Sequence, residues 1–375
     1  MKTIDFLYFD AGGGHRAAAT ALKTVIEQQR RPWDVRLVNL QELLDSLDIF
    51  RKITGIRLEN IYNLLLAKGW TLGSAQLLVA MHGIIRIYHR GQVRLLQEHW
   101  KRAKPDLVVS LVPNFNRAIF ESLSAVQPGT RLVTILTDFA DYPPHFWMER
   151  QPQYFICGTD RAVQQARSLG HSDDRIFRVS GMILRSDFYQ PVTVDRASER
   201  ARLGLQTHLP TGLVLFGGQG SQAMLEIADQ LDRAGIDLQL ILICGRNERL
   251  TNKLKSRKTR IPMLIEGFTP DIPYYMRLSD FFIGKAGPGS ISEALHMKLP
   301  VIVERNSWTL PQERFNTEWV REKEVGLVVS SFYGVADAVR RLLEPATLAR
   351  FRQNAGALDN RAVFEIPEIL AKLVQ

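Results

Sequence analysis

The sequence has little cysteine and no long apolar run. Its two cysteines, Cys157 and Cys244, each end a short apolar segment that is typical of a buried strand, so both are predicted to be core thiols. Neither a disulfide framework nor an oxidising compartment is indicated. No apolar run approaches the ~20 residues that a membrane-spanning helix needs. Because the first residues already read as a strand, we expect no signal peptide and a cytoplasmic protein.

Metal-ligand spacings and the common nucleotide-binding motifs are also missing. The eight histidines show no spacing that would hold a metal ion, and neither a metal nor a cofactor is predicted. The glycine-rich turns of the chain lack the Gly-x-Gly-x-x-Gly spacing of dinucleotide-binding turns. Gly284-Lys285 is followed by Ala286 instead of the serine or threonine that ends a phosphate loop. These absences weaken dehydrogenase and kinase interpretations.

Positive charge is in excess along the chain. There are 48 lysines and arginines against 39 acidic residues, which gives a formal net charge of +9. Such an excess suits anionic partners, for example a nucleoside diphosphate or an anionic membrane surface. The basic residues are dispersed and form no run interleaved with aromatic residues. A nucleic-acid partner is therefore not predicted.

Three glycine-rich turns each follow an apolar strand-like run and open a helix. They span residues 12–16, 217–221 and 284–293. Glycine lets the backbone approach a ligand closely, and a helix N-terminus offers N–H groups and partial positive charge to an anion. Glu293 is expected on the first turn of its helix, where its carboxylate can accept hydrogen bonds from ribose hydroxyls. For any one turn, an ordinary strand-to-helix connection is the alternative.

Alternation of strand-like and helix-like segments predicts an α/β fold with two doubly wound domains. A length of 375 residues with 45% hydrophobic residues is enough for two to three domains with sizeable cores. The strands are predicted at residues 4–9, 34–38, 106–111, 131–136 and 153–157, then at 212–216, 238–243, 262–265, 280–283, 300–303 and 326–329.

The domain boundaries follow from this alternation. The first domain is predicted over residues 1–189, with a mostly helical insertion at about 40–103. A polar, proline-containing linker follows at 190–211, then a second domain at 212–360 and a last helix at 361–375 that could pack back on the first domain. Because such sheets bind ligands at the carboxyl ends of their strands, we expect an interdomain cleft lined by the three glycine turns.

The insertion contains an amphipathic segment. Between Gly73 and Arg94, an apolar set is bordered by arginines and a histidine. An apolar face with a basic border can lie in a membrane interface. A helix packed on its own domain has the same pattern, so both interpretations stay open.

Together these motifs resemble a glycosyltransferase of the GT-B type, which has two Rossmann-like domains. More narrowly, the chain resembles the monogalactosyldiacylglycerol synthase group, which is related to the peptidoglycan GlcNAc transferase. The match covers nearly the whole chain. It rests on Gly12-Gly13-Gly14-His15-Arg16, Gly217-Gly218-Gln219-Gly220-Ser221, Gly267-Phe268, Lys285-Ala286-Gly287-Pro288-Gly289-Ser290 with Glu293, and Pro311-Gln312-Glu313 with Asn316.

The resemblance implies that the second domain holds a UDP-sugar. The implied contacts are uracil at Phe268, ribose at Glu293, diphosphate at Gly287, Gly289 and Ser290, and the donor sugar at Gln312 and Glu313, with Gly218 and Ser221 lining the other side. A helix N-terminus at Ser290 suits the charge on a departing diphosphate, so that no metal is required. The group follows its Gln-Glu pair with small residues, whereas Arg314 and Phe315 stand here. Galactose, glucose and GlcNAc therefore stay open as donor sugars.

The resemblance implies that the first domain accepts a lipid. Two residues are candidates for the catalytic base. His15 lies at the tip of the first glycine turn, and histidine titrates near neutrality. Asp138 follows a predicted strand and could act as base or orient His15, with Asp141 as an alternative. Helix capping or phosphate binding by His15, and turn capping by either aspartate, are the competing interpretations.

Four further residues are assigned to the acceptor side. Gly13 and Gly14 belong to the first glycine turn, while His145 and Trp147 are expected to shape the acceptor entrance. A core position is the alternative for Trp147, since partly buried tryptophans are common.

The sequence therefore predicts an inverting, metal-independent transferase that moves a hexose from a UDP-sugar to a lipid hydroxyl, with diacylglycerol as the favoured acceptor. We expect a peripheral protein on the inner face of the cytoplasmic membrane. One alternative is GlcNAc transfer to an undecaprenyl-linked or other glycolipid. The others are a UDP-sugar 2-epimerase and a non-catalytic nucleotide-binding or membrane-adaptor protein.

Overall fold

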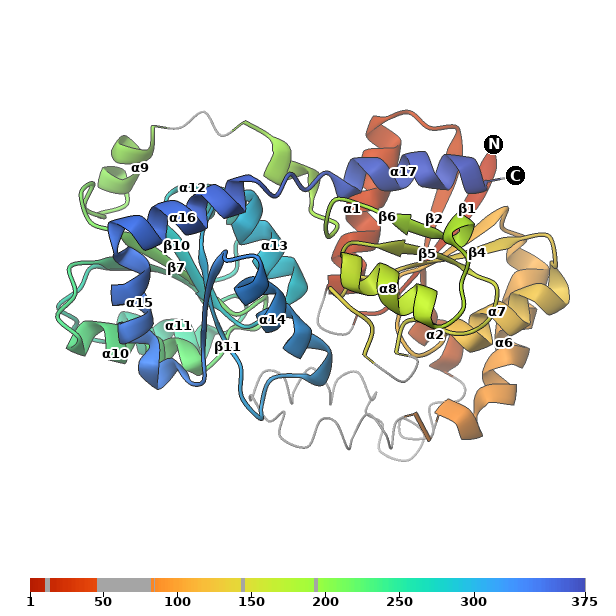
Figure 1. The fold of residues 1–375 in the computed structure, drawn as a ribbon, viewed down its shortest axis with the longest axis horizontal. Coiled ribbons are helices and arrows are strands. Elements are labelled where there is room, and N and C mark those ends of the chain that lie inside the picture. Colours follow the sequence, from red (N-terminus) through yellow and green to blue (C-terminus); the bar gives the residue numbers. More distant parts are fainter. Residues whose placement is uncertain (11–13, 46–81, 84, 143–145, 192–194, 375) are drawn as a thin grey trace. The chain divides into compact units, whose positions relative to one another are not determined.

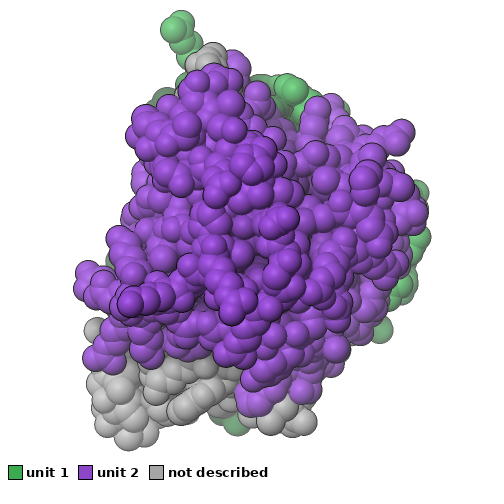
Figure 2. All heavy atoms as spheres, turned by 90° about the vertical axis from the view of Figure 1, so that its left-hand side faces the viewer, with its two compact units in different colours: residues 1–64, 73–186, 360–375 green, residues 65–72, 187–359 purple. Residues whose placement is uncertain are grey.

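The computed structural model describes residues 1–374 except for 11–13, 46–81, 84, 143–145 and 192–194 (Figure 1). The chain forms two compact units, which Figure 2 distinguishes by colour. Among the described residues, unit 1 comprises 1–45, 82–186 and 360–374, and unit 2 comprises 187–359. No helix in these described ranges has the length and apolar character to cross a membrane.

Unit 1 contains a parallel sheet of six strands. They are β1 (Lys2–Tyr8), β2 (Trp33–Asn39), β3 (Leu107–Ser110), β4 (Arg131–Ile135), β5 (Tyr154–Cys157) and β6 (Ile176–Arg178). The spatial order is β2-β1-β3-β4-β5-β6, so the order reverses between β1 and β3. The central strand β3 is buried along its whole length, which explains its apolar run from Leu107 to Val109.

Helices cover the sheet of unit 1. They are α1 (Gly14–Gln28), α2 (Leu40–Leu44), α6 (His89–Ala103), α7 (Asn116–Val126), α8 (Asp160–Ser168) and α17 (Ala362–Leu373), with a 3₁₀ turn, η2, at Asp173–Arg175. The chain's last helix, α17, packs against α1. Its final turn is also tied to β4, because Arg131 donates a hydrogen bond to the carbonyl of Leu373 at 3.0 Å.

Unit 2 contains a second parallel sheet of six strands. They are β7 (Thr211–Leu215), β8 (Gln239–Ile243), β9 (Met263–Glu266), β10 (Phe281–Gly284), β11 (Val301–Glu304) and β12 (Gly326–Val329), in the order β12-β11-β10-β7-β8-β9. The order therefore reverses between β7 and β10. The strand predictions agree with both sheets, except that β6 was not expected.

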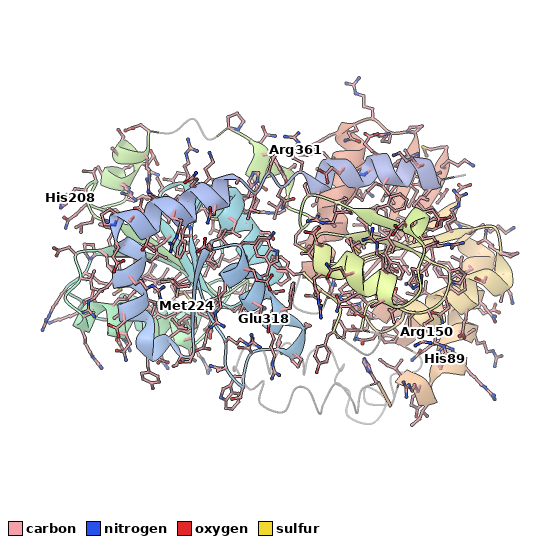
Figure 3. All side chains as sticks on the ribbon, viewed as in Figure 1. His89, Arg150, His208, Met224, Glu318 and Arg361 are labelled. Carbon is pink, nitrogen blue, oxygen red and sulfur yellow. The ribbon has the colours of Figure 1, made fainter. Side chains whose placement is uncertain are left out.

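The helices of unit 2 connect its strands. They are α9 (Arg196–Arg202), α10 (Ala223–Arg233), α11 (Glu248–Lys255), α12 (Ile272–Arg277), α13 (Pro288–His296), α14 (Arg314–Glu322), α15 (Val335–Leu343) and α16 (Pro345–Gly356), with 3₁₀ turns η3 (Ser186–Tyr189), η4 (Pro311–Glu313) and η5 (Phe332–Gly334). Met224 of α10, labelled in Figure 3, is fully buried in the core of this unit. Both cysteines are free and buried, as expected, and burial raises the pKa of the Cys157 thiol to about 12.

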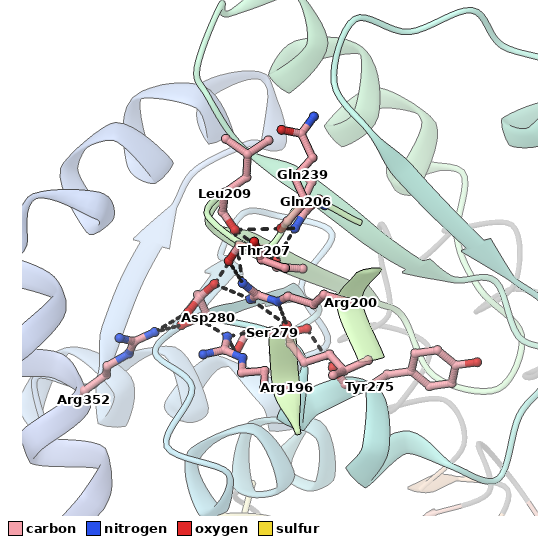
Figure 4. Close-up of polar contacts among 12 residues, drawn as sticks. Arg196, Arg200, Gln206, Thr207, Leu209, Gln239, Tyr275, Ser279, Asp280 and Arg352 are labelled. Carbon is pink, nitrogen blue, oxygen red and sulfur yellow. Dashed lines mark hydrogen bonds and ion pairs between the residues drawn. The ribbon is translucent and has the colours of Figure 1, made fainter. Parts of the chain in front are cut away.

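Helix α9, in the segment predicted as a linker, is anchored to unit 2 by one carboxylate (Figure 4). Asp280 precedes β10 and pairs with Arg196 at 2.8 Å, Arg200 at 2.7 Å and Arg352 at 2.8 Å. Arg200 also donates hydrogen bonds to three backbone carbonyls. Its Nε and Nη2 atoms both bond to Leu278, and its Nη1 atom bonds to Thr207 and Leu209. The surrounding arginines favour the ionised carboxylate, and the pKa of Asp280 is lowered despite its burial.

Candidate active site

The predicted donor-binding motifs gather at the carboxyl ends of the unit 2 strands. The glycine turn 217–221 follows β7, and the turn that begins at Lys285 follows β10. Because β7 and β10 are neighbours and the strand order reverses between them, these two turns flank a topological switch point. In doubly wound sheets, ligands bind at this place.

Close backbone packing fixes the turns after β7 and β8. Gly220 has φ 61°, and a Cβ atom there would lie 2.6 Å from the carbonyl oxygen of Cys244. The amide of Arg246 donates to the carbonyl of Gly218 at 2.9 Å, which joins the two turns. The Ser221 hydroxyl accepts a hydrogen bond from the amide of Ala223 at 3.2 Å, so this side chain is engaged at the start of α10.

A pocket with a volume of about 630 Å³ lies beside these turns. It is lined by Gly245, Arg246, Glu248, Thr251, Asn252, Gly267 and Phe268. The Phe268 ring is 58% exposed, and the guanidinium carbon of Arg246 lies 4.4 Å from its centroid. An exposed aromatic face paired with an arginine can stack on a planar base. Sequence reasoning had not singled out Arg246, because a lone arginine after a strand carries no motif.

The N-terminus of α13 presents open backbone. Gly287 is the N-cap residue in an extended conformation, and Pro288 is the first helical residue. A Cβ atom added to Gly289 would meet nothing within 4 Å, so the backbone there is accessible. Ser290 lies in the same first turn. Backbone N–H groups in this position and the helix dipole favour an anion.

The position of Glu293 on its helix differs from the prediction. The helix begins at Pro288, which makes Glu293 its sixth residue, on the second turn instead of the first. Proline suits the first helical position because its fixed φ matches the helix and its missing N–H would have no partner there. The Glu293 side chain is partly exposed.

The connection after β11 brings further polar groups to the turn after β10. Glu313 is buried and accepts a hydrogen bond from Lys285 Nζ at 3.2 Å. Asn316 of α14 donates to the carbonyl of Ala286 at 2.7 Å. Two buried acceptors, Gln312 Oε1 and Asn316 Oδ1, have no hydrogen-bond partner among the described residues. Acceptors of this kind suit hydroxyl donors such as those of a sugar.

In unit 1, His15 is the second residue of α1 and contacts two residues from distant segments. Its Nδ1 atom lies 3.1 Å from the Thr137 hydroxyl, and its ring centroid lies 5.7 Å from that of Trp147. The side chain keeps some exposed surface, yet protein atoms surround it closely. This burial lowers the pKa of His15 to about 4, against a smaller opposing effect from a hydrogen bond with the backbone of Leu111.

Trp147 is held by both candidate aspartates. Its indole N–H donates to Asp138 Oδ2 at 2.8 Å, and its backbone N–H donates to Asp141 Oδ1 at 2.7 Å. Trp147 is fully buried, so in this structure it supports His15 and Asp138 and does not line an entrance. The core interpretation of this residue is therefore the better one. Gly14 opens α1, whereas Gly13 and His145 lie outside the described residues.

Comparisons with known proteins agree with this geometry. Residues 213–306 match the family model described as the glycosyltransferase family 28 C-terminal domain. The chloroplastic monogalactosyldiacylglycerol synthase of Spinacia oleracea is 27% identical, with 100% of this chain and 73% of the relative covered. Monogalactosyldiacylglycerol synthase 1 of Arabidopsis thaliana is 28% identical, with 100% and 71% covered. The chain is a glycosyltransferase, and over its whole length it is similar to monogalactosyldiacylglycerol synthases.

Solved structures place this glycosyltransferase in the GT-B fold. Acinetobacter baumannii MurG has a TM-score of 0.62 at 12% identity, with 99% of this chain and 100% of that chain covered. The UDP co-structure of S. aureus MnaA has a TM-score of 0.64 at 16% identity, with 100% and 98% covered. The predictions of an α/β GT-B fold and of a glycosyltransferase are confirmed. The site residues and the interdomain cleft stay predictions.

Proposed function

We propose that this glycosyltransferase moves a hexose from a UDP-sugar to a hydroxyl of a lipid, with diacylglycerol as the acceptor. The curated relatives are named for monogalactosyldiacylglycerol synthesis and align with the whole chain. The observation that supports donor binding is that Phe268, the α13 N-terminus and Glu313 follow strands β9, β10 and β11 of one parallel sheet, and so lie along its carboxyl edge. Aromatic, anion-binding and carboxylate groups in this arrangement match the base, diphosphate and sugar of a single ligand.

In the proposed complex, each part of the UDP-sugar is bound by residues of unit 2. Uracil stacks on Phe268 beside Arg246, and the diphosphate lies at the backbone of Gly289 and Ser290. Glu293 accepts hydrogen bonds from the ribose hydroxyls. Gln312 and Glu313 accept hydrogen bonds from the sugar, which gives the buried Gln312 Oε1 the partner that it lacks among the described residues.

His15 is the proposed base of an inverting transfer. The lipid hydroxyl attacks the anomeric carbon while the bond to the diphosphate breaks, and His15 takes the hydroxyl proton. The low pKa of His15 keeps the imidazole neutral, and therefore able to accept a proton, throughout the neutral range. Asp138 acts through Trp147 as a positioning residue in this scheme. We also propose that no metal takes part, since the α13 N-terminus supplies positive potential at the leaving group.

We further propose that the protein binds the inner face of the cytoplasmic membrane. Its net charge of +9 favours an anionic surface. At the described end of the predicted amphipathic segment, Ile87 is 77% exposed, and Arg86 and Arg90 on either side of it are also exposed. An exposed aliphatic side chain between arginines suits the boundary of an anionic bilayer.

The deciding experiment supplies purified protein with UDP-galactose, UDP-glucose or UDP-GlcNAc, together with either diacylglycerol or an undecaprenyl-linked sugar in anionic vesicles. Product mass identifies both the sugar and the acceptor. We expect a monohexosyldiacylglycerol with one of the first two donors. A product formed only from UDP-GlcNAc and an undecaprenyl-linked acceptor would replace the acceptor proposal with its alternative, and no transfer from any donor would overturn it.

A further inference from the structure

The excess of positive charge is concentrated in one segment of unit 2. Residues 246–260 contain seven lysines and arginines and one acidic residue, Glu248, so the segment has a net charge of +6 whereas the whole chain has +9. The segment comprises helix α11 and the connections on both sides of it. Basic residues are spread along the chain, but their excess over acidic residues is not.

Helix α11 borders the pocket beside the turns after β7 and β8. Its N-cap residue, Asn247, donates a hydrogen bond to the carbonyl of Gln219 in the glycine turn after β7 at 3.3 Å. Leu250 and Leu254 are buried in the core of unit 2. These contacts fix the helix beside the pocket. The helix contributes three residues to the pocket lining, namely Glu248, Thr251 and Asn252.

Exposed cations of α11 lie close to this lining. Lys255 comes four residues after Thr251 and is therefore on the same side of the helix. Arg249 and Lys253 lie one turn apart on an adjoining face. All three cationic side chains are exposed, and within the described part of the chain no carboxylate pairs with any of them. Their charge is therefore not compensated locally.

The rest of the segment is partly compensated. Arg257, in the connection after α11, pairs with Asp229 of α10. Asp232 of the same helix accepts a hydrogen bond from the backbone amide of Arg260. The uncompensated charge thus belongs to the helix that lines the pocket.

The three cations lie near enough to act on an anion that approaches the pocket. Lys255 is the farthest of them along the helix, about 4.5 Å beyond Asn252 at a rise of about 1.5 Å per residue. The Debye length at physiological ionic strength is about 8 Å. The charge of each cation therefore reaches the pocket without full screening.

The composition of this face favours a soluble anion over a bilayer. Helices that lie in a membrane interface combine basic residues with large apolar side chains that enter the lipid. Among the described residues, no large apolar side chain within 247–260 is exposed. A nucleoside diphosphate ester, by contrast, needs only the charge.

We propose that Arg249, Lys253 and Lys255 steer the anionic donor toward the pocket, and that they raise its association rate without contacting it in the bound state. This inference rests on the proposed function. A cleft lined by one sign of charge concentrates ligands of the opposite sign and accelerates their association by about 10- to 10³-fold. Because the attraction acts before contact, it changes the association rate and leaves the dissociation rate nearly constant.

The main test removes the three charges together, as Arg249→Gln, Lys253→Gln and Lys255→Gln. Stopped-flow fluorescence measures the association and dissociation rates of a UDP ester that carries a fluorophore in place of the hexose, and calorimetry measures uridine affinity. At low salt the variant should bind the UDP ester about fivefold more slowly or worse, with the dissociation rate and uridine affinity within about twofold of wild type. At about 0.5 M salt, screening should make the two association rates nearly equal.

A charge-matched control removes three exposed cations from the helices beside β11 and β12, at the other end of the sheet from β8 and β9. They are Arg321, Lys323 and Arg341, each changed to glutamine. This control has the net charge of the test variant, and its association rate should stay within about twofold of wild type. Glu248→Gln removes the carboxylate at the pocket and should speed association, a gain that no folding defect produces.

Equal slowing in the test and control variants would mean that net charge attracts the donor, and would overturn the role of α11. Faster dissociation in place of slower association would indicate direct contact and overturn it as well. An unchanged association rate together with weaker sedimentation on anionic vesicles would assign this face to the membrane instead. A wild-type protein that fails to bind UDP would overturn the proposed function itself, and this inference with it.

Discussion

The two units present different polar groups after their strands. In unit 2, buried oxygens of Gln312 and Asn316 lack hydrogen-bond partners among the described residues. In unit 1, the buried carboxylates of Asp138 and Asp141 both accept hydrogen bonds from Trp147. A polar group that is buried without a partner costs free energy, and a ligand can remove that cost. At the carboxyl ends of the strands, this difference supports the proposal that unit 2 captures the donor and that unit 1 supplies a prearranged scaffold.

The scaffold in unit 1 surrounds one reactive group. Trp147 contacts His15 through its ring and the two aspartates through its N–H groups. The Thr137 hydroxyl lies 3.1 Å from Nδ1 of the same imidazole. These contacts restrict the histidine before any substrate arrives. Preorganised groups of this kind act on the chemical step more than on ground-state binding. Substitutions in the two units should therefore separate rate from affinity.

The largest effect is expected from His15→Ala. Loss of a general base lowers turnover by roughly 10²- to 10⁴-fold, whereas UDP affinity should stay within about twofold. Steady-state kinetics and calorimetry on the same preparation measure the two quantities. Thr137→Val, which removes only the neighbouring hydroxyl, is the milder companion variant. If His15→Ala weakened UDP binding as much as it slowed turnover, the division of labour between the units would be wrong.

The pH dependence of the transfer rate tests the proposal that His15 is the base. Burial lowers the pKa of His15 from its ordinary 6.5 to about 4, so the neutral form persists well below neutrality. As pH falls through about 4, protonation removes the base and the transfer rate should decline with it. The measurement is the acid limb of kcat/KM between pH 3.5 and 7, taken in short assays with unfolding monitored separately. An acid limb near 6.5 in a fully folded protein would contradict a buried base.

Glu293→Gln is expected to have the next largest effect, and on unit 2 alone. Losing carboxylate hydrogen bonds to the ribose should weaken UDP binding by about 1–3 kcal/mol. The decisive comparison uses 2′,3′-dideoxy-UDP, which lacks both ribose hydroxyls and should bind the variant and the wild-type protein almost equally. A variant that still discriminates UDP from its dideoxy analogue by the wild-type ratio would place the ribose elsewhere.

The proposed site in unit 2 has a clearer sequence signal than the proposed site in unit 1, for a physical reason. The proposed donor-site residues come in short contiguous strings after strands, so one string such as 285–290 carries its own signal. The contacts of His15 come instead from α1, Thr137 and Trp147, which only the fold brings together. No local pattern marks Thr137, and its proximity to the histidine could not be predicted.

Errors in the predicted secondary structure occur where the local sequence carries too weak a signal. Strand β6 has three residues, is not buried, and offers too little apolar sequence to predict. Helix α11, which was not predicted, buries only Leu250 and Leu254, so its apolar periodicity is one turn long. Glu293 was placed one turn too early because the helix starts at Pro288. Long buried strands, by contrast, are continuous apolar runs, and such runs can be recognised from the sequence alone.

Trp147→Phe tests the scaffold of unit 1 through protein stability. The change removes the indole N–H that Asp138 accepts but keeps the backbone N–H that donates to Asp141. The loss should lower the free energy of unfolding by about 1–3 kcal/mol, because Asp138 is buried. Thermal denaturation measures it, and Trp308→Phe, at a 44% exposed tryptophan of unit 2, is the matched control. Equal shifts in both variants would mean that the bond to Asp138 contributes little.

The smallest effect is expected at the membrane. Removing both charges with Arg86→Gln and Arg90→Gln should weaken binding to anionic vesicles by about 1 kcal/mol per charge. The difference from the wild-type protein should be greatest at low salt and shrink as the ionic strength rises. Arg341→Gln, at an exposed arginine of unit 2, is the control and should change nothing. Vesicle sedimentation at several salt concentrations measures these affinities. If the unit 2 control lost as much binding as the unit 1 variants, membrane attraction would follow from net charge, and the comparison between the units would not extend to the lipid surface.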